Sequence, residues 1–237
     1  MTEKLSVVIP VYNEGENILK TLRSFYEKVR TPAEICLIYD RDDDTTIPVI
    51  RAHQPEFPGV FLKKNKYGRG VLNAIKSGLK AAGGDAVLVT MGDLSDDYSI
   101  VDQMFAQVKD GFDVVCGSRY IRGGKQIGGP LLKKTMTRIA GWSLHLLSGI
   151  PTHDISNSFK MYSKKLLAEI QVESSGGFEV GMEITVKAYL NGYKVTEIPS
   201  VWTDRAEGKS NFKLVQWLPK YLHWYFFLLK RKLFGMG

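Results

Sequence analysis

The chain has 237 residues, of which 44% are hydrophobic and 24% charged, values that suit a globular protein with a sizeable core. Its net charge of +7 favours an anionic partner such as a nucleotide or an acidic lipid surface. The two cysteines, Cys36 and Cys116, lie in apolar runs, which argues against a disulfide and excludes a cysteine-based zinc site.

Apolar runs typical of buried strands alternate with helix-like segments through the first half of the chain. Strands are predicted at residues 5–11, 35–39, 60–62, 86–91 and 113–116, and helices at 15–29, 46–52, 69–82 and 98–109. This alternation predicts an α/β fold whose sheet is mostly parallel and doubly wound, with helices on both faces. The loops that follow the strands would then meet at one edge of the sheet, where such folds bind ligands.

The second half of the chain is less regular. Helices are predicted at 131–147 and 181–191, strands at 159–162 and 193–198, a Gly-rich loop at 123–130 and a mobile polar loop at 203–211. Residues 212–234 are aromatic and basic, and Pro219 is expected to divide them into two helical pieces. We therefore divide the chain into a domain of residues 1–212 and an amphipathic C-terminal tail of residues 213–237.

One apolar run ends abruptly in three carboxylates, those of Asp93, Asp96 and Asp97. Carboxylates gathered at a sheet edge repel one another unless a cation intervenes, and oxygen ligands suit Mg²⁺ or Mn²⁺, ions that commonly carry phosphates. The pattern therefore indicates a metal–nucleotide site. The alternative is an acidic turn followed by a helix that Ser95 or Asp97 caps.

Other predicted strand ends carry groups that can bind a nucleotide. Tyr12 can stack on a base, and Glu14 and Asp40 can accept hydrogen bonds from a base or ribose. Small residues at Gly68 and Gly70 let the backbone approach a phosphate at a helix start.

Each of these loops also has a purely structural interpretation. Asn13 would cap the first helix and Asp44 the second, while Asp42 and Asp43 would be solvated. Arg119 offers a planar fork for phosphate oxygens, or it pairs with a nearby acid.

In order and spacing, these segments resemble the family 2 glycosyltransferases with the GT-A fold, specifically the dolichol-phosphate mannose synthase-like branch. The resemblance covers residues 5–212 and is carried by Ser6–Glu14, Ile38–Asp40, Gly68–Gly70, Met91–Ser95, Asp113–Tyr120, Asp154–Tyr162, Gly177–Glu179 with Glu183, Gly192 and Tyr193 with Glu197–Pro199, and Asp204 with Arg205.

The resemblance implies an inverting transfer of a sugar from a nucleotide-diphosphate sugar, such as GDP-mannose or a UDP-sugar, to a polyprenyl or dolichyl phosphate. It assigns nucleotide-sugar binding to Pro10, Tyr12, Glu14, Asp40, Gly68, Gly92 and Asp93. It assigns catalytic roles to Asp93, Arg119 and Arg205, with Asp93 and Ser95 holding Mg²⁺ or Mn²⁺. The acceptor phosphate would meet Arg119, Lys133, Lys134 and Thr137.

The tail has a composition that suits the headgroup region of a membrane, because its aromatic residues are flanked by lysines and arginines. No stretch has the roughly 18 uncharged apolar residues of a membrane span, and the first residues lack a signal-peptide pattern. We therefore expect a cytoplasmic protein, peripheral at the membrane face, with no nucleic-acid partner. A separate membrane subunit or a homo-oligomer is also compatible with the tail, which could equally pack on the core.

The sequence departs from the family pattern at the metal site, because Met91 occupies the place of the first Asp of the usual Asp-X-Asp motif. Two alternatives stay open, and the missing Asp supports only the second of them. One is a glycosyltransferase that acts on a soluble or glycan acceptor, and the other is a protein that binds nucleotide sugars without turnover.

Overall fold

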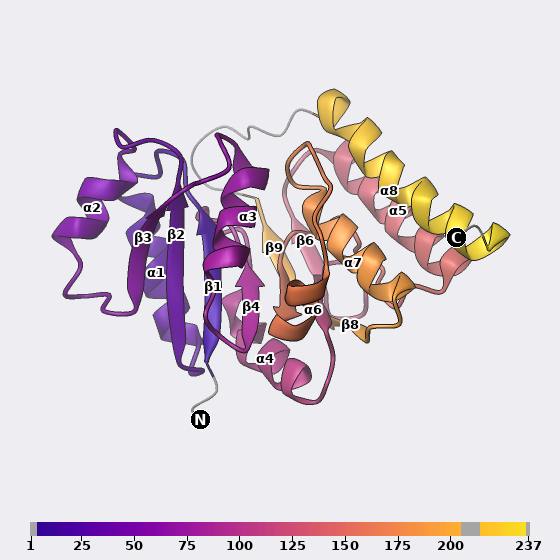
Figure 1. The fold of residues 1–237 in the computed structure, drawn as a ribbon, viewed down its shortest axis with the longest axis horizontal. Helices are drawn as coiled ribbons and strands as arrows, with labels where there is room; N and C mark the ends of the chain where they lie inside the picture. Colours follow the sequence, from indigo (N-terminus) through magenta and orange to yellow (C-terminus); the bar gives the residue numbers. More distant parts are fainter. Residues whose placement is uncertain (1–3, 205–213, 236–237) are drawn as a thin grey trace.

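The computed structural model describes residues 4–204 and 214–235, and it confirms the predicted α/β architecture (Figure 1). Seven strands form one sheet in the order β3 (Val60–Lys64), β2 (Ala33–Tyr39), β1 (Leu5–Pro10), β4 (Ala86–Val89), β7 (Lys160–Ser163), β5 (Val114–Ser118) and β8 (Val195–Pro199). Both pairings of β7 are antiparallel and the other four in this sheet are parallel. The carboxyl ends of the parallel strands therefore share one edge, as the alternating pattern predicts.

Helices cover both faces of this sheet. α1 (Asn17–Lys28) and α4 (Val101–Lys109) bury residues such as Leu22 and Met104 on one face. α3 (Val71–Ala81), α6 (Lys164–Glu169) and α7 (Val180–Leu190) bury residues such as Ile75 and Ile184 on the other. α2 (Thr46–Ala52) follows β2, and its Ile50 joins the core of the first face. Cys36 and Cys116 are buried free thiols, as predicted.

Several elements begin or end differently from the prediction because of the loop backbone. α3 begins at Val71 rather than at residue 69, since Gly70 has a φ of +114° that a right-handed helix does not allow. β4 ends at Val89, two residues early. The helix predicted at 98–109 starts as a 3₁₀ turn, Tyr98–Ile100, before α4. These differences all fall in the loops at the carboxyl ends of the parallel strands, which we call the ligand edge.

A second small sheet was not expected from the sequence. β6 (Lys125–Ile127) lies within the predicted Gly-rich loop and pairs in parallel with β9 (Val201–Thr203). The chain can double back before β6 because Gly124 contacts the Ser118 carbonyl, where a Cβ would lie only 2.3 Å from that oxygen. This sheet places the 119–127 segment beside the end of β9.

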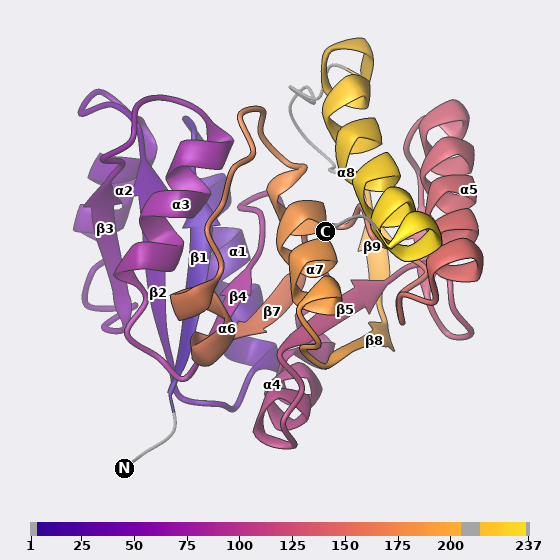
Figure 2. The same cartoon turned by 45° about the vertical axis from the view of Figure 1, so that its right-hand side comes forward.

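The C-terminal residues form one helix, α8 (Leu214–Phe234), so the prediction of two pieces divided at Pro219 is wrong. The helix is held by its neighbours: Trp224 and Leu228 share a buried cluster with Leu144 of α5 (Leu131–Ser148) and with Met182 of α7. Figure 2 shows α8 lying beside α5 at one end of the molecule. Packing on both helices compensates for the backbone hydrogen bond that proline cannot make.

α5 approaches the segment that follows it through a glycine. A Cβ on Gly141 would lie 2.0 Å from the carbonyl oxygen of His153, so helix backbone and loop backbone are in direct contact there. Gly149 ends the helix in the left-handed conformation, as the sequence predicts.

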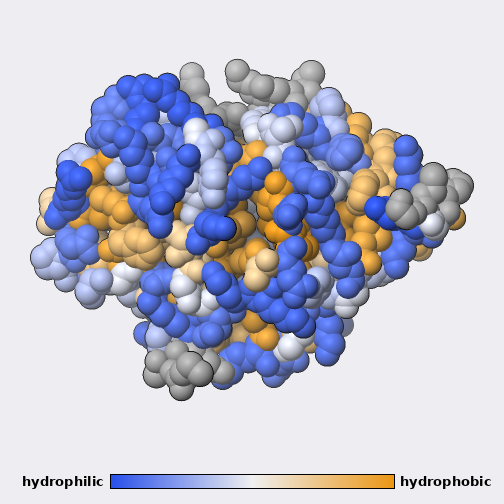
Figure 3. All heavy atoms as spheres, in the orientation of Figure 1, coloured by the Kyte–Doolittle hydropathy of each residue, from blue (hydrophilic) through white to orange (hydrophobic). Residues whose placement is uncertain are grey.

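The outer side of α5 is unusually apolar. Its exposed hydrophobic residues include Ile139 and Leu146, with 62% and 80% of their surface accessible, and the full set is Leu131, Leu132, Ile139, Trp142, Leu146 and Leu147. α8 adds Leu222, Phe226 and Leu233. In Figure 3 hydrophobic residues gather at the right-hand end, where Figure 1 places these two helices. Among the described residues, no helix has the length and apolar content that crossing a bilayer requires.

We predict that α8 contributes to the stability of the whole fold. Leu228→Ala should lower the free energy of unfolding by about 2–5 kcal/mol, because Leu228 is fully buried and its removal leaves a cavity. Phe226→Ala on the same helix, at a position 52% exposed, should change it by less than about 0.5 kcal/mol. Urea denaturation of both variants measures this, and equal small effects would mean that α8 is an independent tail.

Candidate functional site

The loops after β1 and β2 are tied together at the ligand edge. Asn13, with a φ of +53°, donates its backbone N–H to Asp44 Oδ2 over 3.0 Å and accepts from the Thr45 N–H over 3.2 Å. The Glu14 N–H donates to Thr46 Oγ1 over 3.1 Å. The prediction that Asn13 caps α1 is therefore wrong. Asp44 binds the Thr46 N–H at 2.8 Å, so its predicted role at the start of α2 is confirmed.

Asp40 joins the end of β2 to the loop before α3. Its carboxylate accepts from Asn65 Nδ2 at 2.7 Å and from the Gly70 N–H at 2.8 Å. A cavity of about 360 Å³ opens beside it, lined by Asp40, Arg41, Asp42, Asp43, Lys64 and Arg69. Asp42 and Asp43 are exposed to solvent, as predicted, and form surface ion pairs with Lys64 and Arg41. This cavity lies at the end of β2 and offers carboxylate acceptors beside cationic donors, groups that can hydrogen-bond a base or ribose.

The carboxylate loop after β4 lies beside the first loop. A Cβ on Gly92 would lie 3.5 Å from Glu14 Cγ, and the Gly92 carbonyl accepts from Thr21 Oγ1 of α1 at 2.8 Å. Leu94 takes a left-handed φ of +60°, and the Ser95 N–H donates to Asp93 Oδ1 over 3.2 Å. The structure therefore brings Glu14, Gly92 and Asp93 together, as the resemblance implies.

The other two carboxylates of this loop serve the fold. Asp96 Oδ2 accepts from Thr90 Oγ1 at 2.7 Å and from the Met91 N–H at 3.3 Å, inside the protein. Asp97 accepts from the backbone N–H and hydroxyl of Ser99 and caps the 3₁₀ turn. The cap alternative is thus confirmed for Asp97.

The residues after β4 suit a divalent cation that takes few of its ligands from the protein. In the ranges 4–204 and 214–235, no group of three or more His, Cys, Asp or Glu side chains is arranged to hold a metal ion. Asp93 contributes one carboxylate, and Ser95 Oγ is buried without a hydrogen-bond partner. Mg²⁺ is often held by one or two carboxylates and completes its shell with phosphate oxygens and water. This donor set suits such an ion and does not form an all-protein cage.

A basic cavity of about 320 Å³ lies on the other side of the carboxylate loop. Its wall contains four cationic side chains, and the full lining is Arg119, Tyr120, Ile121, Gly124, Lys125, Gln126, Ile127, Lys134 and Arg138. Tyr120 Oη and Thr137 Oγ1 are 2.6 Å apart, and Lys134 Nζ donates to the Gln126 carbonyl over 3.2 Å. These contacts hold the first turns of α5 against the β6 segment. An anion the size of a phosphate fits the charge of this wall.

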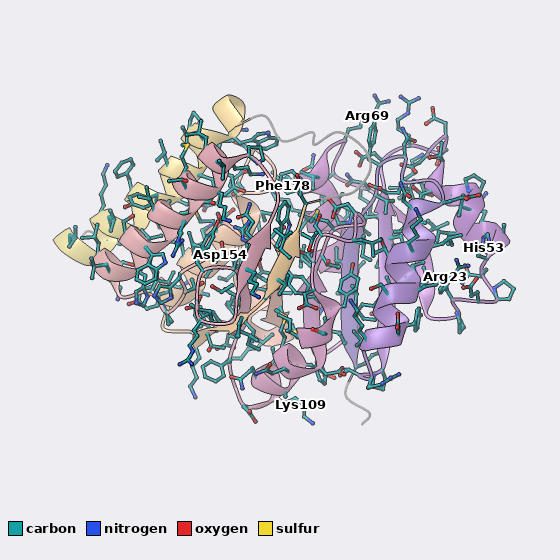
Figure 4. The ribbon with its side chains drawn as sticks, turned by 180° about the vertical axis from the view of Figure 1, so that it is seen from behind. Arg23, His53, Arg69, Lys109, Asp154 and Phe178 are labelled. Atoms are coloured by element: carbon teal, nitrogen blue, oxygen red, sulfur yellow. The ribbon has the colours of Figure 1, made fainter. Side chains whose placement is uncertain are left out.

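Arg119 enters the cavity already paired. Its Nε donates to Asp154 Oδ2 at 2.6 Å and its Nη2 to Asp154 Oδ1 at 2.8 Å, with both side chains buried. Burial lowers the pKa of Arg119, but the attraction of Asp154 outweighs this effect and raises it overall. Figure 4 shows Asp154 inside the molecule behind α5, whereas Arg69 lies at the open upper edge. Since this pair is nearly neutral, an anion would be attracted mainly by the three other cations.

Two backbone hydrogen bonds connect the carboxylate loop to the basic cavity. The Thr203 N–H donates to the Ser95 carbonyl over 3.0 Å, and the Asp204 N–H donates to the Ile127 carbonyl over 2.8 Å. A Cβ on Gly128 would lie 3.0 Å from Asp204 Cβ, so the turn after β6 contacts the same residue. β9 therefore spans the two parts of the site.

The predicted residues fall into distinct groups. Of the predicted acceptor residues, Arg119 and Lys134 line the basic cavity, Thr137 supports its wall through Tyr120, and Lys133 is absent from its lining. Tyr12 is exposed after β1, and Pro10 is partly buried at that strand's end. Arg205 lies outside the described residues.

Two cationic residues of the basic cavity were not predicted from the sequence. Arg138 stands four residues after Lys134 on α5, so helical spacing could have grouped them. Lys125 carried no such signal, because the strand that places it, β6, was not expected.

Comparison with known proteins gives a consistent result. The family model described as Glycosyl transferase family 2 matches residues 6–171. A dolichol-phosphate mannosyltransferase from Pyrococcus furiosus is 28% identical over 213 residues, covering 89% of this chain and 59% of the relative. A polyprenol monophosphomannose synthase from Mycolicibacterium smegmatis is 27% identical over 234 residues, covering 91% of this chain and 87% of the relative. The chain thus spans well under two thirds of the Pyrococcus protein.

Solved structures show the same fold. Glucosyl-3-phosphoglycerate synthase from Mycobacterium tuberculosis, in complex with Mn²⁺, UDP and glucosyl-3-phosphoglycerate, matches with a TM-score of 0.69 at 18% identity. The match covers 99% of this chain and 81% of that structure. The same enzyme in complex with phosphoglyceric acid matches with a TM-score of 0.68.

We predict that Asp96 makes stability fall as the pH rises. Burial raises the pKa of Asp96 to about 6, with the hydrogen bond from Thr90 opposing the shift and the charge of Asp93 adding to it. The folded state therefore binds this proton more tightly than the unfolded state. Its contribution to stability is complete below about pH 4 and is lost as the pH rises through about 6.

Asp96→Asn removes this dependence while keeping an oxygen for Thr90. The difference in unfolding free energy between wild type and variant should change by about 2–3 kcal/mol between pH 4 and pH 7. Urea denaturation across this range, without divalent cations, measures it. A difference that stays constant with pH would show that folding does not raise the pKa of Asp96.

Proposed function

The chain belongs to glycosyl transferase family 2, and from that premise we propose that it transfers a sugar, with inversion, from a nucleotide-diphosphate sugar to a polyprenyl phosphate. The names of both curated relatives support a polyprenol-type acceptor and a mannosyl donor. The observation that carries the proposal is the basic cavity beside the carboxylate loop, joined to it through β9. A donor diphosphate and an acceptor phosphate need such neighbouring sites.

The donor is proposed to occupy the sheet edge formed by the loops after β1, β2, β3 and β4. Asp40 and the cavity beside it would take the nucleoside, with Pro10, Tyr12 and Glu14 on the β1 side. Gly68 leaves room for a phosphate to approach the backbone, since a Cβ there would meet only Asn73 Nδ2, at 3.6 Å. Gly92 packs against Glu14 and stays a proposed donor contact through its backbone. The relatives' names favour a mannosyl donor, for which we propose GDP-mannose, and a UDP-sugar is the alternative that the solved neighbour favours.

Mg²⁺ or Mn²⁺ at Asp93 and Ser95 would neutralise the charge that develops on the departing diphosphate. The Mn²⁺ in the solved neighbour supports this assignment. Since Met91 brings no carboxylate, the protein would supply few of the ion's ligands. The residues around the ion would orient the diphosphate and exclude water from the anomeric carbon. We propose that Arg205 acts with them on the phosphates.

The acceptor phosphate is proposed to occupy the basic cavity. Lys125, Lys134 and Arg138 would hold its oxygens, and the Arg119–Asp154 pair would form the rigid floor. A phosphate dianion is already a nucleophile at neutral pH, so the reaction needs no strong general base. The task of the chain is then to place one phosphate oxygen in line with the leaving diphosphate. Lys133 stays a proposed outer contact on the first turn of α5.

A membrane surface is the proposed location of the acceptor. The exposed apolar residues of α5 continue directly from the helix turn that carries Lys134 and Arg138, with Trp142 among them. Basic and tryptophan side chains beside an apolar stripe suit the headgroup layer of a bilayer. The sequence indicated that the C-terminal residues contact the membrane, and α8 would contribute a second contact through Leu222 and Phe226.

A second candidate is transfer to a soluble phosphorylated acceptor. The observation that favours it is the structural neighbour's complex with phosphoglyceric acid, a small anion that the basic cavity could also accommodate. Such an acceptor would leave the apolar side of α5 without a role in the reaction. Family membership sets aside the alternative of a non-catalytic binding protein.

The transfer assay uses the full chain, radiolabelled GDP-mannose or UDP-glucose, Mn²⁺ and polyprenyl phosphate in vesicles, with phosphoglyceric acid as the soluble acceptor. We expect label in the organic phase. Asp93→Asn should lower kcat at least about 100-fold, as loss of an electrostatic stabiliser does. Arg138→Ala should raise the acceptor KM roughly tenfold, a loss of about 1.4 kcal/mol, with the donor KM unchanged.

Matched controls make these effects specific. Asp97→Asn alters a carboxylate of the same loop that only caps a turn, and Arg122→Ala removes an exposed arginine that does not line the cavity. Both should retain transfer within about threefold, a change under 1 kcal/mol. Organic-phase label absent with every donor would contradict a polyprenyl acceptor, and label on phosphoglyceric acid alone would establish the second candidate.

Membrane contact through α5 predicts a vesicle-binding phenotype. Leu146→Glu should reduce flotation with phosphatidylcholine–phosphatidylglycerol vesicles roughly tenfold, because a buried leucine is worth about 1.5–3 kcal/mol. Gln103→Glu adds the same charge at an exposed site of α4, away from this surface, and should float like wild type. Equal flotation of the two variants would exclude α5 as the contact.

A further inference from the structure

Residues 171–179, which we call the bridging segment, connect three helices. Ser174 is held through each of its polar groups: its N–H donates to Glu183 Oε2 of α7 at 2.8 Å, and its carbonyl accepts from Lys76 Nζ of α3 at 3.1 Å. Its hydroxyl accepts from Trp224 Nε1 of α8 at 3.2 Å. Glu183 is fully buried and also binds the Glu173 N–H. The position of this segment is therefore determined jointly by α3, α7 and α8.

Gly177 lies between a side chain of α8 and a side chain of α3. A Cβ at this position would lie 2.2 Å from Trp217 Cη2 of α8 and 3.1 Å from Val71 Cγ1 of α3. Phe178, labelled in Figure 4, packs against the Trp217 ring with centroids 6.1 Å apart, and Lys220 Nζ donates to the Ser175 carbonyl at 3.1 Å. The glycine is in contact with both helices at once.

Val71 is the first residue of α3 and directly follows the proposed donor loop. The Gly70 N–H before it donates to Asp40, and Ser77 of α3 donates to Asn65, which itself binds Asp40. A displacement of the start of α3 would therefore move Gly68–Gly70 relative to Asp40. The chain of contacts runs from α8 through Trp217, Gly177 and Val71 to the donor loop.

We propose that Trp217 is a positioning residue for the donor site, acting through Gly177 and Val71 on the loop at residues 68–70. The inference rests on the proposed function only in taking that loop as part of the donor site. It gives α8 a role in nucleotide binding that is exerted through Gly177 and Val71. It also connects the helix that shares a core with α5 to the opposite side of the site.

Nucleotide binding by the full chain tests this, with GDP and UDP as probes in titration calorimetry with Mn²⁺. Trp217→Ala and Gly177→Ala should weaken binding roughly 5- to 10-fold, within the usual range of coupling between sites. Trp217→Phe retains a ring against Gly177 and should bind within about twofold of wild type. In transfer assays the donor KM should rise in the first two variants while the acceptor KM stays constant.

His223→Ala is the control, since His223 is an exposed aromatic of α8 whose ring contacts lie within its own helix. Thermal unfolding of each variant separates a loss of folded protein from a loss of affinity, and Lys220→Ala replaces Gly177→Ala if the latter fails to fold. If folded Trp217→Ala binds nucleotide with wild-type affinity, this inference is overturned and the proposed donor site is not affected. A wild type that binds neither nucleotide overturns the proposed donor site and the inference with it.

Discussion

The buried ion pair between Arg119 and Asp154 is the interaction on which the basic cavity depends. Asp154 binds the backbone N–H, Nε and Nη2 of Arg119, so one carboxylate fixes both the chain direction after β5 and the side chain. Leaving one member of such a pair alone in the interior costs about 3–5 kcal/mol. The segment between α5 and β7 cannot move away from β5 without that cost.

A second buried cation reinforces this segment. Lys160 is fully buried, and its ammonium donates to the carbonyls of Ile155 and Asn157. Burial lowers its pKa, with the charges of nearby groups opposing the shift. Asn157 in turn donates to the Gly117 carbonyl at 2.8 Å. The turn that carries Asp154 is thus fixed by its own backbone carbonyls, and the cavity floor is rigid where a reacting phosphate would need it to be.

The sequence predicted the central sheet well because each of its strands and helices is identified by a pattern within a short stretch of residues. Alternating strands and helices imply parallel strands, and parallel strands gather their following loops, so the proximity of Glu14, Asp40 and Asp93 followed from order alone. The family resemblance selected Asp93 from the sequence, whereas the burial of Asp96 became visible only in the structure. Both follow an apolar run, but one lies at the edge and the other is buried against Thr90. Nothing in the spacing of the two residues distinguishes these environments.

The basic cavity and the C-terminal helix were harder to predict for a different reason. Lys125 reaches the cavity through a three-residue strand whose partner lies about 75 residues later, and such pairing leaves no periodic signal. Pro219 indicated a break in α8 by its local preference, and packing against α5 and α7 overrode that preference. The partner of Arg119 was likewise set by a contact 35 residues away along the chain.

The backbone contact at Gly141 is a point about which α5 can tilt. The helix touches the His153 carbonyl there, one residue before the rigid turn at Asp154, while Lys134 lies seven residues, or about 10 Å, along the axis. A few degrees of tilt about this point would move Lys134 and Arg138, the two cations that α5 contributes to the cavity wall, and leave its floor in place. Contact of another surface with the exposed apolar residues of α5 would then tilt the helix and change the width of the cavity. The helix would in this way couple surface contact to the space available for a phosphate.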